Sequence, residues 1–472
     1  MDKLLNRIKR IIPKRIFKFF QPAYHFLLSW FSALIYSRPS EKLIVIGVTG
    51  TTGKTTSVYL IAKMLESAGY KVGYTSTAMF SDGEKEWLND KKMTMIGRFF
   101  TQKILRQMVC NKCQYAIIET TSEGIAQYRH YFINYDILVF TGLYKEHIDS
   151  HGSFENYKQT KGKLFAYLKN CKTKYVDDKK YVCKSDTGIK KIDLNRVKKV
   201  IIANGDDEHA DYFLGFKAEE KMKVEVKSEK LEVINKKSKE YSDVKKVIAL
   251  NVDVDSSGTS FVVNGVKINL RLLGEFNIAN AMTAVCLGLS QGLEMEQIKK
   301  GLGNIKGVAG RFERIDSGQN FIVIVDYAFE PRAVAKLYET VKLIPHKKVI
   351  HVLGSTGGGR DVVRRPKLGK LAGEKADYVI ITNEDPYDDD PRIIIDQVAV
   401  GAEHVGKKIG DNLFKILDRR EAIRKALFLA SKGDVVLITG KGSEQAICIA
   451  GGEKIKWDDR EVVREELQKV RS

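Results

Sequence analysis

Short apolar runs alternate with amphipathic segments through most of this chain, and the pattern predicts an α/β protein. Residues 43–46 form an apolar run rich in β-branched side chains, and residues 58–66 follow with helical periodicity. Residues 115–119 and 137–141 repeat the apolar pattern, and each run ends in a polar residue. Polar residues at successive strand ends are typical of a parallel sheet, whose functional sites lie at the carboxyl ends of its strands.

The pattern changes twice further along the chain. Residues 224–233 and 247–254 alternate between apolar and polar side chains, which favours antiparallel strands, and Asn264-Gly265 is a hairpin turn signal. Short apolar runs before polar residues then return after residue 314. We therefore expect a central domain with a mostly parallel sheet over residues 41–313 and a C-terminal Rossmann-like α/β domain over residues 314–472.

Residues 1–40 differ from the rest because basic residues alternate with Leu, Ile and Phe. Their apolar run, residues 26–36, is shorter than the roughly 20 residues needed to span a bilayer. A basic, aromatic and amphipathic segment of this kind can lie in a membrane interface. The alternative is a helical pair packed against the following domain.

Composition narrows the functional classes. The chain has 472 residues, 43% of them hydrophobic, which is enough for two or three ordinary cores. Its formal charge of +20 favours anionic partners, but the lysines are widely spread and no nucleic-acid module is recognisable among them. Six scattered cysteines complete no zinc site, although Cys110 and Cys113 form one CxxC pair, and they indicate reduced thiols in a cytosolic protein.

The loop between the first predicted strand and helix is rich in glycine and ends in Lys-Thr-Thr. Glycines let backbone N–H groups approach phosphate oxygens, and a helix N-terminus adds partial positive charge. Lys54 would reach the β- and γ-phosphates of ATP, and the Thr55 hydroxyl would bind Mg²⁺. The alternative, a plain turn before a helix, does not explain why all these features coincide. The loop residues predicted to bind ATP are Gly50, Thr51, Thr52, Gly53, Lys54, Thr55 and Thr56.

The form of this loop, GxxGxxGKTT, resembles that of the Mur ligase family, enzymes that form amide bonds with ATP. Thr52 replaces the asparagine usual in the family. A second match, TGLYKEHIDSHGSFENYKQTKGKLF, resembles the family run TNLxxDHLDxHGxxExYxxAKxxLF, with Glu146 and Thr160 as conservative departures.

The resemblance implies a set of catalytic residues, namely Lys54, Glu119, His147 and Lys161. Glu119 and His147 would bind a catalytic Mg²⁺, and Lys161 matches a lysine that the family carbamylates to hold a second Mg²⁺. Taken alone, Glu119 could be a solvated strand-end carboxylate and His147 a core or surface histidine. Thr121 and Ser122, just after the same strand, are expected to contact the substrate.

Three further motifs resemble the segments through which family members contact the nucleotide. LLGEFNIANAMTA implies that Asn280 contacts adenine, whereas helix capping competes as the role of Asn277. VAGRFERI places Arg311 near nucleotide or phosphate, which suits a guanidinium. DYAFEP implies that Asp326 holds a ribose, with Phe329 where the family has His.

The last motifs concern the amino acid that would be added. TNEDPYDDDP resembles the family's TxDNPxxEDP, in which enzymes that select diaminopimelate carry Arg where this chain has Tyr387. An acidic set there favours a cationic side chain, so we expect lysine or another diamine rather than diaminopimelate. The expected substrate contacts in this half of the chain are Arg360, Glu384, Asp385, Pro386, Tyr387, Lys441 and Glu444.

The resemblance implies an ATP-dependent ligase that joins an amino acid to a muramyl-peptide carboxylate through an acyl phosphate, with two Mg²⁺ ions. We expect a cytoplasmic enzyme, with attachment of residues 1–40 to the inner face of the membrane as one alternative. Family members that act on muramyl peptides carry a uridine-binding domain before the P-loop, whereas only residues 1–40 precede it here. The acceptor alternatives are a lipid-linked muramyl peptide and a polyglutamate- or cyanophycin-type substrate. A catalytically silent nucleotide-binding partner is the non-enzyme alternative, and the intact catalytic set disfavours it.

Overall fold

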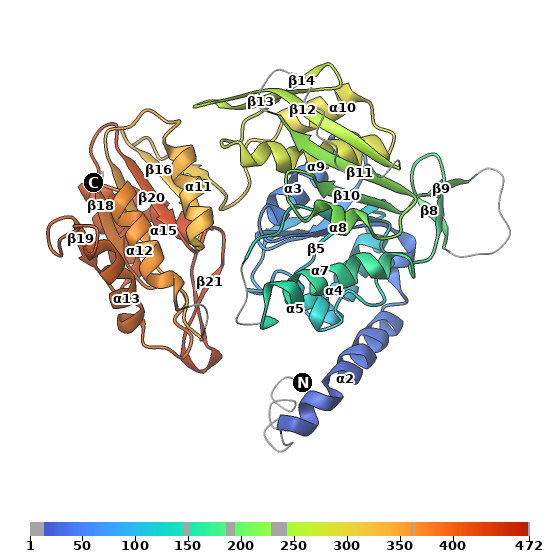
Figure 1. Cartoon of the computed structure of the whole chain (residues 1–472), viewed down its shortest axis with the longest axis horizontal. Coiled ribbons are helices and arrows are strands. Elements are labelled where there is room, and N and C mark those ends of the chain that lie inside the picture. The colour runs from blue at the N-terminus through green and yellow to red at the C-terminus, as the bar shows by residue number, and fades with distance from the viewer. Residues whose placement is uncertain (1–13, 146–150, 186–193, 228–242, 360–361, 471–472) are drawn as a thin grey trace.

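The structure is a computed structural model of the chain. The residues that it describes are 14–145, 151–185, 194–227, 243–359 and 362–470. Two of the predicted site residues, His147 and Arg360, lie outside them. Figure 1 shows two bodies side by side, the first built on an eleven-stranded sheet and the second on a six-stranded sheet.

Seven parallel strands form the middle of the large sheet, and antiparallel strands extend it at both edges. Its strands are β1 (Ile44–Thr49), β2 (Val72–Thr75), β3 (Met79–Ser81), β4 (Glu86–Leu88), β5 (Tyr115–Glu119), β6 (Ile137–Phe140), β10 (Val200–Asn204), β11 (Glu220–Val226), β12 (Val244–Asp255), β13 (Gly258–Val263) and β14 (Val266–Leu270). They are ordered β14-β13-β12-β11-β10-β6-β1-β5-β2-β3-β4. The predicted P-loop therefore follows a strand at the centre of the sheet.

Helices cover both faces of this sheet, which explains why its central strands are apolar along their whole length. The helices are α3 (Lys54–Ser67), α4 (Arg98–Cys110), α5 (Ser122–Ala126), α7 (Phe154–Leu168), α8 (Ala210–Leu214), α9 (Phe276–Ser290) and α10 (Met295–Gly303). Ile44, Ile46 and Val48 of β1 join one core with α3, α9 and α10. Val45 joins the opposite core with α4, α7 and α8.

The prediction that residues 224–233 and 247–254 form antiparallel strands is confirmed for one edge of β12 and is wrong for the pairing of the described part of β11 with β12. β11 and β12 pair in parallel, with Val224 opposite Val247, and the antiparallel neighbour of β12 is β13. Alternating side chains indicate that one sheet face is solvated, but they carry no information on strand direction. The predicted turn at Asn264-Gly265 is confirmed, because it joins β13 to β14 with positive φ at both residues.

The second sheet is parallel apart from its first strand. Its strands are β15 (Glu313–Ile315), β16 (Ile322–Asp326), β20 (Val435–Thr439), β17 (Val349–Leu353), β18 (Tyr378–Ile381) and β19 (Leu413–Lys415), in spatial order. Five helices cover it: α11 (Pro331–Val341), α12 (Arg364–Lys375) and α13 (Pro391–Glu403) on one core, and α14 (Arg419–Leu429) and α15 (Asp459–Val470) on the other. The α/β class predicted from the sequence is confirmed in both bodies.

Smaller elements decorate the two bodies. They are the strands β7 (Lys174–Val176), β8 (Val182–Ser185) and β9 (Asn195–Val197), the hairpin β21 (Ala446–Cys448) and β22 (Lys454–Lys456), and the 3₁₀ helices η1 (Pro39–Lys42) and η2 (Ala450–Gly452). The hairpin lies after the last strand of the second sheet, beside the motif that contains Lys441.

Among the described residues, the long helix α2 (Lys14–Ile35) precedes the first sheet and extends away from the body in Figure 1. Phe26 packs against the rings of Tyr131 and Phe132, and the Ser29 hydroxyl donates a hydrogen bond of 2.8 Å to the Tyr128 carbonyl oxygen. Among the described residues, none of the helices is long and apolar enough to cross a bilayer.

Candidate active site

The predicted P-loop connects β1 to α3, and its glycines are required by close packing. A Cβ on Gly50 would lie 2.1 Å from the Thr141 hydroxyl, and a Cβ on Gly53 would lie 2.3 Å from the Asn280 side-chain oxygen. Gly53 also has φ +79°, in the left-handed region that favours glycine. The loop thus places the N-terminus of the 14-residue helix α3, with its first N–H groups, at the carboxyl end of the sheet.

Glu119 ends β5, the strand beside β1, and its side chain reaches the P-loop. Thr55 Oγ1 donates a hydrogen bond of 2.9 Å to Glu119 Oε2, and Thr77 donates to the same carboxylate through its N–H and its hydroxyl. Thr55 and Glu119 are 64 positions apart in the sequence, and the parallel pairing of β1 with β5 brings them together. A buried carboxylate beside a hydroxyl is a donor set of hard oxygens, which fits Mg²⁺.

Two lysines flank the loop. Lys54 Nζ donates a hydrogen bond of 2.6 Å to the Thr51 carbonyl oxygen. Lys161, on α7, is buried, and its Nζ donates a hydrogen bond of 2.8 Å to the Gly50 carbonyl oxygen. Both lysines therefore lie beside the P-loop, and their catalytic roles and the carbamylation of Lys161 stay predictions.

Arg311 connects the two bodies at this point. Its guanidinium donates a hydrogen bond of 3.3 Å to Thr55 Oγ1 and lies 4.3 Å from the centroid of the Tyr327 ring. Asp326 accepts hydrogen bonds of 2.6 Å from the N–H groups of Phe312 and Ala328, so it shapes the same junction. Burial raises the pKa of Asp326 despite the nearby Arg311.

Asn280 lies on α9 at the back of the P-loop. The Ser57 hydroxyl donates to its side-chain oxygen at 3.5 Å, and its own amide donates to the Asn277 oxygen at 3.3 Å. Asn277 donates a hydrogen bond of 2.7 Å to the Leu273 carbonyl oxygen, four residues earlier. Asn280 therefore lies next to the P-loop, and its contact with adenine stays a prediction, whereas Asn277 stabilises the start of its own helix.

A second cluster of charges lies at the carboxyl ends of the second sheet. Lys441 Nζ is 2.9 Å from Asp385 Oδ1 and 2.8 Å from Glu444 Oε2. Glu384 is buried in the adjoining position, and burial together with the Asp385 charge raises its pKa to about 7. The structure thus brings together four residues predicted from two motifs almost sixty positions apart.

Lys92 is a member of this cluster that sequence reasoning missed. Its Nζ lies 2.6 Å from Asp385 Oδ2 and also forms an ion pair with Glu444, although it belongs to the first body. Nothing in its neighbourhood, NDKKMT, distinguishes it from any surface lysine. The contact depends on how the two bodies pack against each other, and a local sequence motif does not predict that packing.

The other predicted substrate contacts have local partners. The Thr121 hydroxyl caps α5 by accepting from the Gly124 N–H at 3.1 Å, and Ser122 Oγ lies 3.1 Å from His151 Nε2. The Tyr387 N–H donates to the Cys448 carbonyl oxygen at 3.1 Å, which ties that motif to β21. The Pro386 carbonyl oxygen accepts from the Asp389 N–H at 3.1 Å. Their roles toward a substrate remain predictions, as do those of His147 and Arg360.

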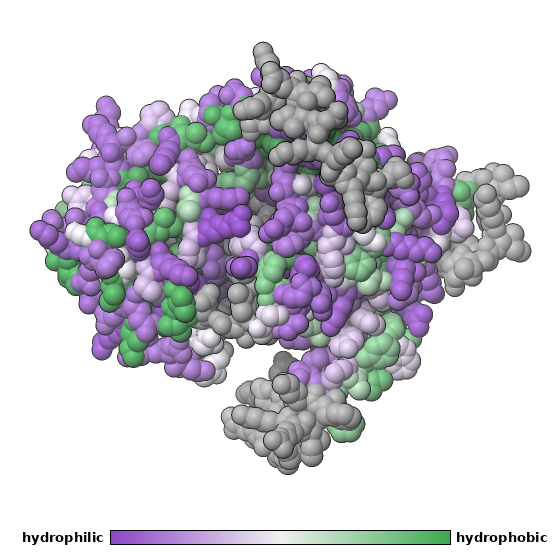
Figure 2. All heavy atoms as spheres, in the orientation of Figure 1, coloured by the Kyte–Doolittle hydropathy of each residue, from purple (hydrophilic) through white to green (hydrophobic). Residues whose placement is uncertain are grey.

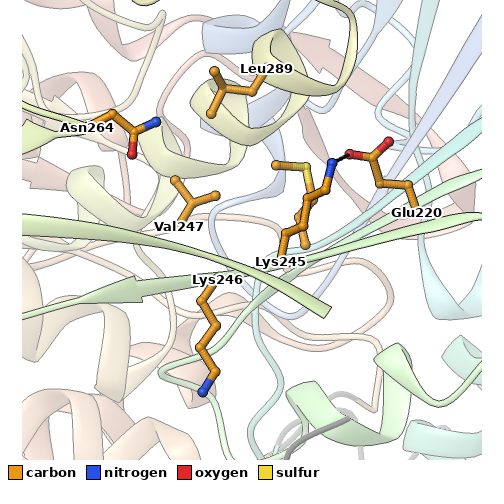
Figure 3. A pocket seen from close by; sticks show the side chains of 7 residues that line it. Glu220, Lys245, Lys246, Val247, Asn264 and Leu289 are labelled. Atoms are coloured by element: carbon orange, nitrogen blue, oxygen red, sulfur yellow. Dashed lines mark hydrogen bonds and ion pairs between the residues drawn. The ribbon is translucent and has the colours of Figure 1, made fainter. Parts of the chain in front are cut away.

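A pocket of about 430 Å³ lies away from these clusters, between β11, β12 and the end of α9 (Figure 3). Glu220 and Lys245 form an ion pair of 2.8 Å at its edge. None of its lining residues belongs to the predicted site.

Two family models match the chain. The model of the Mur ligase middle domain matches residues 48–288, and that of the Mur ligase glutamate ligase domain matches residues 310–442. The chain belongs to the Mur ligase family. It is an ATP-dependent ligase of the kind that acts in peptidoglycan precursor synthesis. Its P-loop falls within the first matched region, and Glu384, Asp385 and Lys441 of the charged cluster fall within the second.

Curated relatives of this Mur ligase carry two kinds of name. A UDP-N-acetylmuramyl-tripeptide synthetase of Roseiflexus sp. (strain RS-1) is 35% identical over 445 residues, covering 93% of this chain and 81% of the relative. A UDP-N-acetylmuramoyl-L-alanyl-D-glutamate--2,6-diaminopimelate ligase of Geobacillus thermodenitrificans (strain NG80-2) is 33% identical over 443 residues, covering 92% and 81%.

Solved structures agree with this assignment at the level of the fold. A UDP-N-acetylmuramoyl-L-alanyl-D-glutamate--2,6-diaminopimelate ligase has 25% identity and a TM-score of 0.55, covering 91% of this chain and 79% of that one. A folylpolyglutamate synthase of Mycobacterium tuberculosis has 16% identity and a TM-score of 0.63, covering 89% and 93%.

Proposed function

We propose that this Mur ligase joins lysine, or another diamine, to the free carboxylate of a muramyl dipeptide. The observation that carries the proposal is the facing position of two sites: the P-loop with Glu119 on the first body, and the acidic cluster of Asp385 and Glu444 on the second. Arg311 and Lys92 cross between them. A nucleotide site and an amine site on opposing sheet ends suit a reaction that joins their two ligands.

The chemistry has two steps. A carboxylate oxygen of the acceptor attacks the γ-phosphorus of ATP, ADP leaves, and an acyl phosphate forms. The amine of the incoming amino acid then attacks the acyl carbon, loses a proton, and releases inorganic phosphate. Lys54 and Arg311 would neutralise charge that develops on the transferred phosphoryl group.

Magnesium would supply further neutralisation of that charge. We assign one ion to Thr55 and Glu119, whose oxygens are 2.9 Å apart, with His147 as the ligand implied by the family resemblance. A second ion would need carbamylated Lys161. The buried position of this lysine beside Gly50 supports that assignment.

The preference for a diamine follows from charge. Glu384 and Asp385 are buried acidic residues, and Tyr387 occupies the position at which enzymes selecting diaminopimelate carry arginine in the family pattern. Position 387 therefore supplies no cation that would pair with a second carboxylate on the amino acid. The relatives include both tripeptide synthetases and diaminopimelate ligases, so the choice is a property to be measured.

The test measures phosphate release from ATP by the full chain with Mg²⁺ and bicarbonate. UDP-MurNAc-L-Ala-D-Glu is present or absent, with L-lysine, L-ornithine or meso-diaminopimelate. We expect release only when the acceptor is present together with L-lysine or L-ornithine. A strong preference for diaminopimelate would overturn the amino-acid assignment. Absence of release with every amino acid, from protein that binds ATP, would overturn the acceptor and turn attention to lipid-linked or polyglutamate substrates.

We also propose that α2 attaches this enzyme to the inner face of the cytoplasmic membrane. Phe31, Leu34 and Ile35 are each more than 40% exposed, and Figure 2 shows apolar side chains gathered near this end of the molecule. The sequence of this segment also includes Lys14, Arg15 and Lys18, and basic residues suit anionic headgroups. A lipid-linked acceptor would then be within reach, which keeps that alternative in view.

Co-sedimentation with phosphatidylglycerol vesicles tests this attachment. We expect binding that weakens as salt is added, and little binding to phosphatidylcholine vesicles. Replacement of Phe31 and Leu34 by serine should abolish binding, whereas Phe428→Ser, which removes an exposed phenylalanine of α14, should leave it unchanged. Equal sedimentation of all three proteins would contradict the proposal.

A further inference from the structure

Lys92 extends from the connection between β4 and α4 into the acidic cluster of the second body. Its Nζ lies 2.6 Å from Asp385 Oδ2, pairs with Glu444, and leaves the side chain only 6% exposed. Its backbone has φ +56°, a conformation that side-chain-bearing residues rarely adopt. Such a conformation persists only where its surroundings hold it, so the connection is held in the conformation from which Lys92 reaches these carboxylates.

The cluster already contains a cation from its own body. Lys441 is fully buried, and its Nζ contacts the same two carboxylates at 2.9 and 2.8 Å. Asp385 Oδ1 also accepts a hydrogen bond of 2.7 Å from the Cys448 N–H. Two carboxylates and two ammonium groups therefore balance, and removing Lys92 would leave one negative charge in excess.

Lys92 remains protonated in this position. Burial alone would lower its pKa, but the charges of Glu444 and Asp385 outweigh burial and raise the pKa above its ordinary value. A protonated amine is not a nucleophile, so Lys92 does not compete with the substrate for the acyl phosphate. It does carry a primary ammonium group, which is the group that every incoming amino acid also carries.

We propose that Lys92 is an internal occupant of the substrate's ammonium site, and that the amino acid binds by displacing it from Asp385 and Glu444. The inference rests on the proposed function, because these carboxylates are the ones assigned to the amino acid. Displacement restores the charge balance of the cluster and frees the first body from this contact with the second. The apparent affinity for the amino acid is lowered by the fraction of molecules in which Lys92 occupies the site.

Calorimetric titration of the full chain tests this inference. The probes are L-lysine and L-norleucine, which has the same carbon chain without the side-chain ammonium. Lys92→Met removes the competing cation, so we expect L-lysine to bind about tenfold more tightly than it does to the wild type. Lys91→Met is the matched control, because Lys91 Nζ pairs with exposed Asp90 and lies 5.5 Å from the centroid of the Phe100 ring, away from the acidic cluster. The affinity of this variant for L-lysine should equal that of the wild type.

The two probes distinguish which ammonium takes the place of Lys92. If Lys92→Met gains affinity for L-lysine alone, the side-chain ammonium takes the place of Lys92. If it gains affinity for both probes, the α-ammonium does. Unchanged, weaker or absent binding of L-lysine by Lys92→Met would overturn the inference. Lys92→Arg is the second variant: it keeps a cation with bidentate geometry, so it should bind L-lysine more weakly than the wild type, and equal binding would also overturn it.

Phosphate release separates this inference from the proposed function. If the wild type shows release that depends on the amino acid and Lys92→Met gains no affinity, only the role of Lys92 fails. If the wild type shows no such release with any tested acceptor or amino acid, the proposed function fails.

Discussion

Glu119 accepts three hydrogen bonds from two threonines and lies beside the P-loop hydroxyl of Thr55. Such a carboxylate is held in one orientation, which suits a metal ligand. The Glu119→Gln variant keeps the shape but removes the charge, so we expect turnover to fall by about 100-fold or more. The Mg²⁺ concentration for half-maximal rate should rise as well.

Glu123→Gln provides the control for this change, because Glu123 is exposed on the neighbouring helix α5. It should leave both the turnover number and the Mg²⁺ requirement unchanged. Equal effects of the two substitutions would show that Glu119 has no special place in the reaction.

Glu384 provides a pH-dependent test at the same scale. Burial, assisted by Asp385, raises its pKa to about 7 in the folded chain, against about 4.3 in the unfolded chain. Between these values the folded state holds a proton that the unfolded state has lost, so this group's contribution to stability falls as pH rises. Glu384→Gln cannot ionise, and its stability relative to the wild type should therefore increase from pH 5 to pH 8.

The increase is expected to reach about 3 kcal/mol and to level off above pH 8. Thermal or urea unfolding of both proteins across this pH range measures it. Any loss of packing in the variant adds an offset that does not depend on pH. A difference between the two proteins that stays constant from pH 5 to pH 8 would exclude a raised pKa at Glu384.

At the scale of elements, a buried charge cluster joins strands at the amino ends of the large sheet, opposite the P-loop. Asp136, just before β6, accepts hydrogen bonds from the Val45 N–H at 2.8 Å and from Lys174 and Lys199 at 2.5 and 2.8 Å. Burial lowers the pKa of Lys174 to about 8 although Asp136 opposes the shift. The predicted active-site residues thus lie at one end of the sheet, while charges at the other end hold strands in register.

Asp136→Asn would leave both lysines without a carboxylate in a buried site. We expect the free energy of unfolding to fall by about 3–5 kcal/mol at neutral pH. Lys174 would then lose its proton more readily in the folded state than in the unfolded state, so the loss should be smaller at pH 9 than at pH 7. Asp211→Asn, which breaks an exposed pair with Lys223, should change stability by less than about 1 kcal/mol.

The sequence predicted features that depend on one local element, and it did not predict contacts between elements that are distant in the chain. Local patterns predict the strand ends, the P-loop and the order of the motifs. The described structure confirms that a glycine-containing loop joins a strand, β1, to a helix, α3, and the binding of phosphate by this loop stays a prediction. The direction of β11 relative to β12 was predicted wrongly, because period-two alternation is the same in both arrangements. Lys92 was missed because its partners lie 293 and 352 positions away.

At the scale of the whole molecule, the reaction requires that ligands bound to the two bodies meet, and Arg311 lies where it can link nucleotide binding on the first body to the second. Its guanidinium contacts the P-loop through Thr55 and lies on the Tyr327 ring of the second body. If it also binds the nucleotide, Arg311→Ala should weaken ADP binding by about tenfold or more, since charged hydrogen bonds contribute about 1.5–3 kcal/mol. The rise in melting temperature produced by ADP should shrink accordingly.

A purely structural role for Arg311 would give a different result. Removing a bridge that touches no ligand would lower the melting temperature of the free protein and leave the increment from ADP intact. Arg314→Ala controls for loss of a nearby arginine, because among the described residues the Arg314 guanidinium donates one long, exposed hydrogen bond, of 3.4 Å, to the Ser256 carbonyl oxygen. Thermal shifts of the three proteins over a range of ADP concentrations therefore decide whether the junction senses nucleotide, and an unchanged increment in Arg311→Ala would show that it does not.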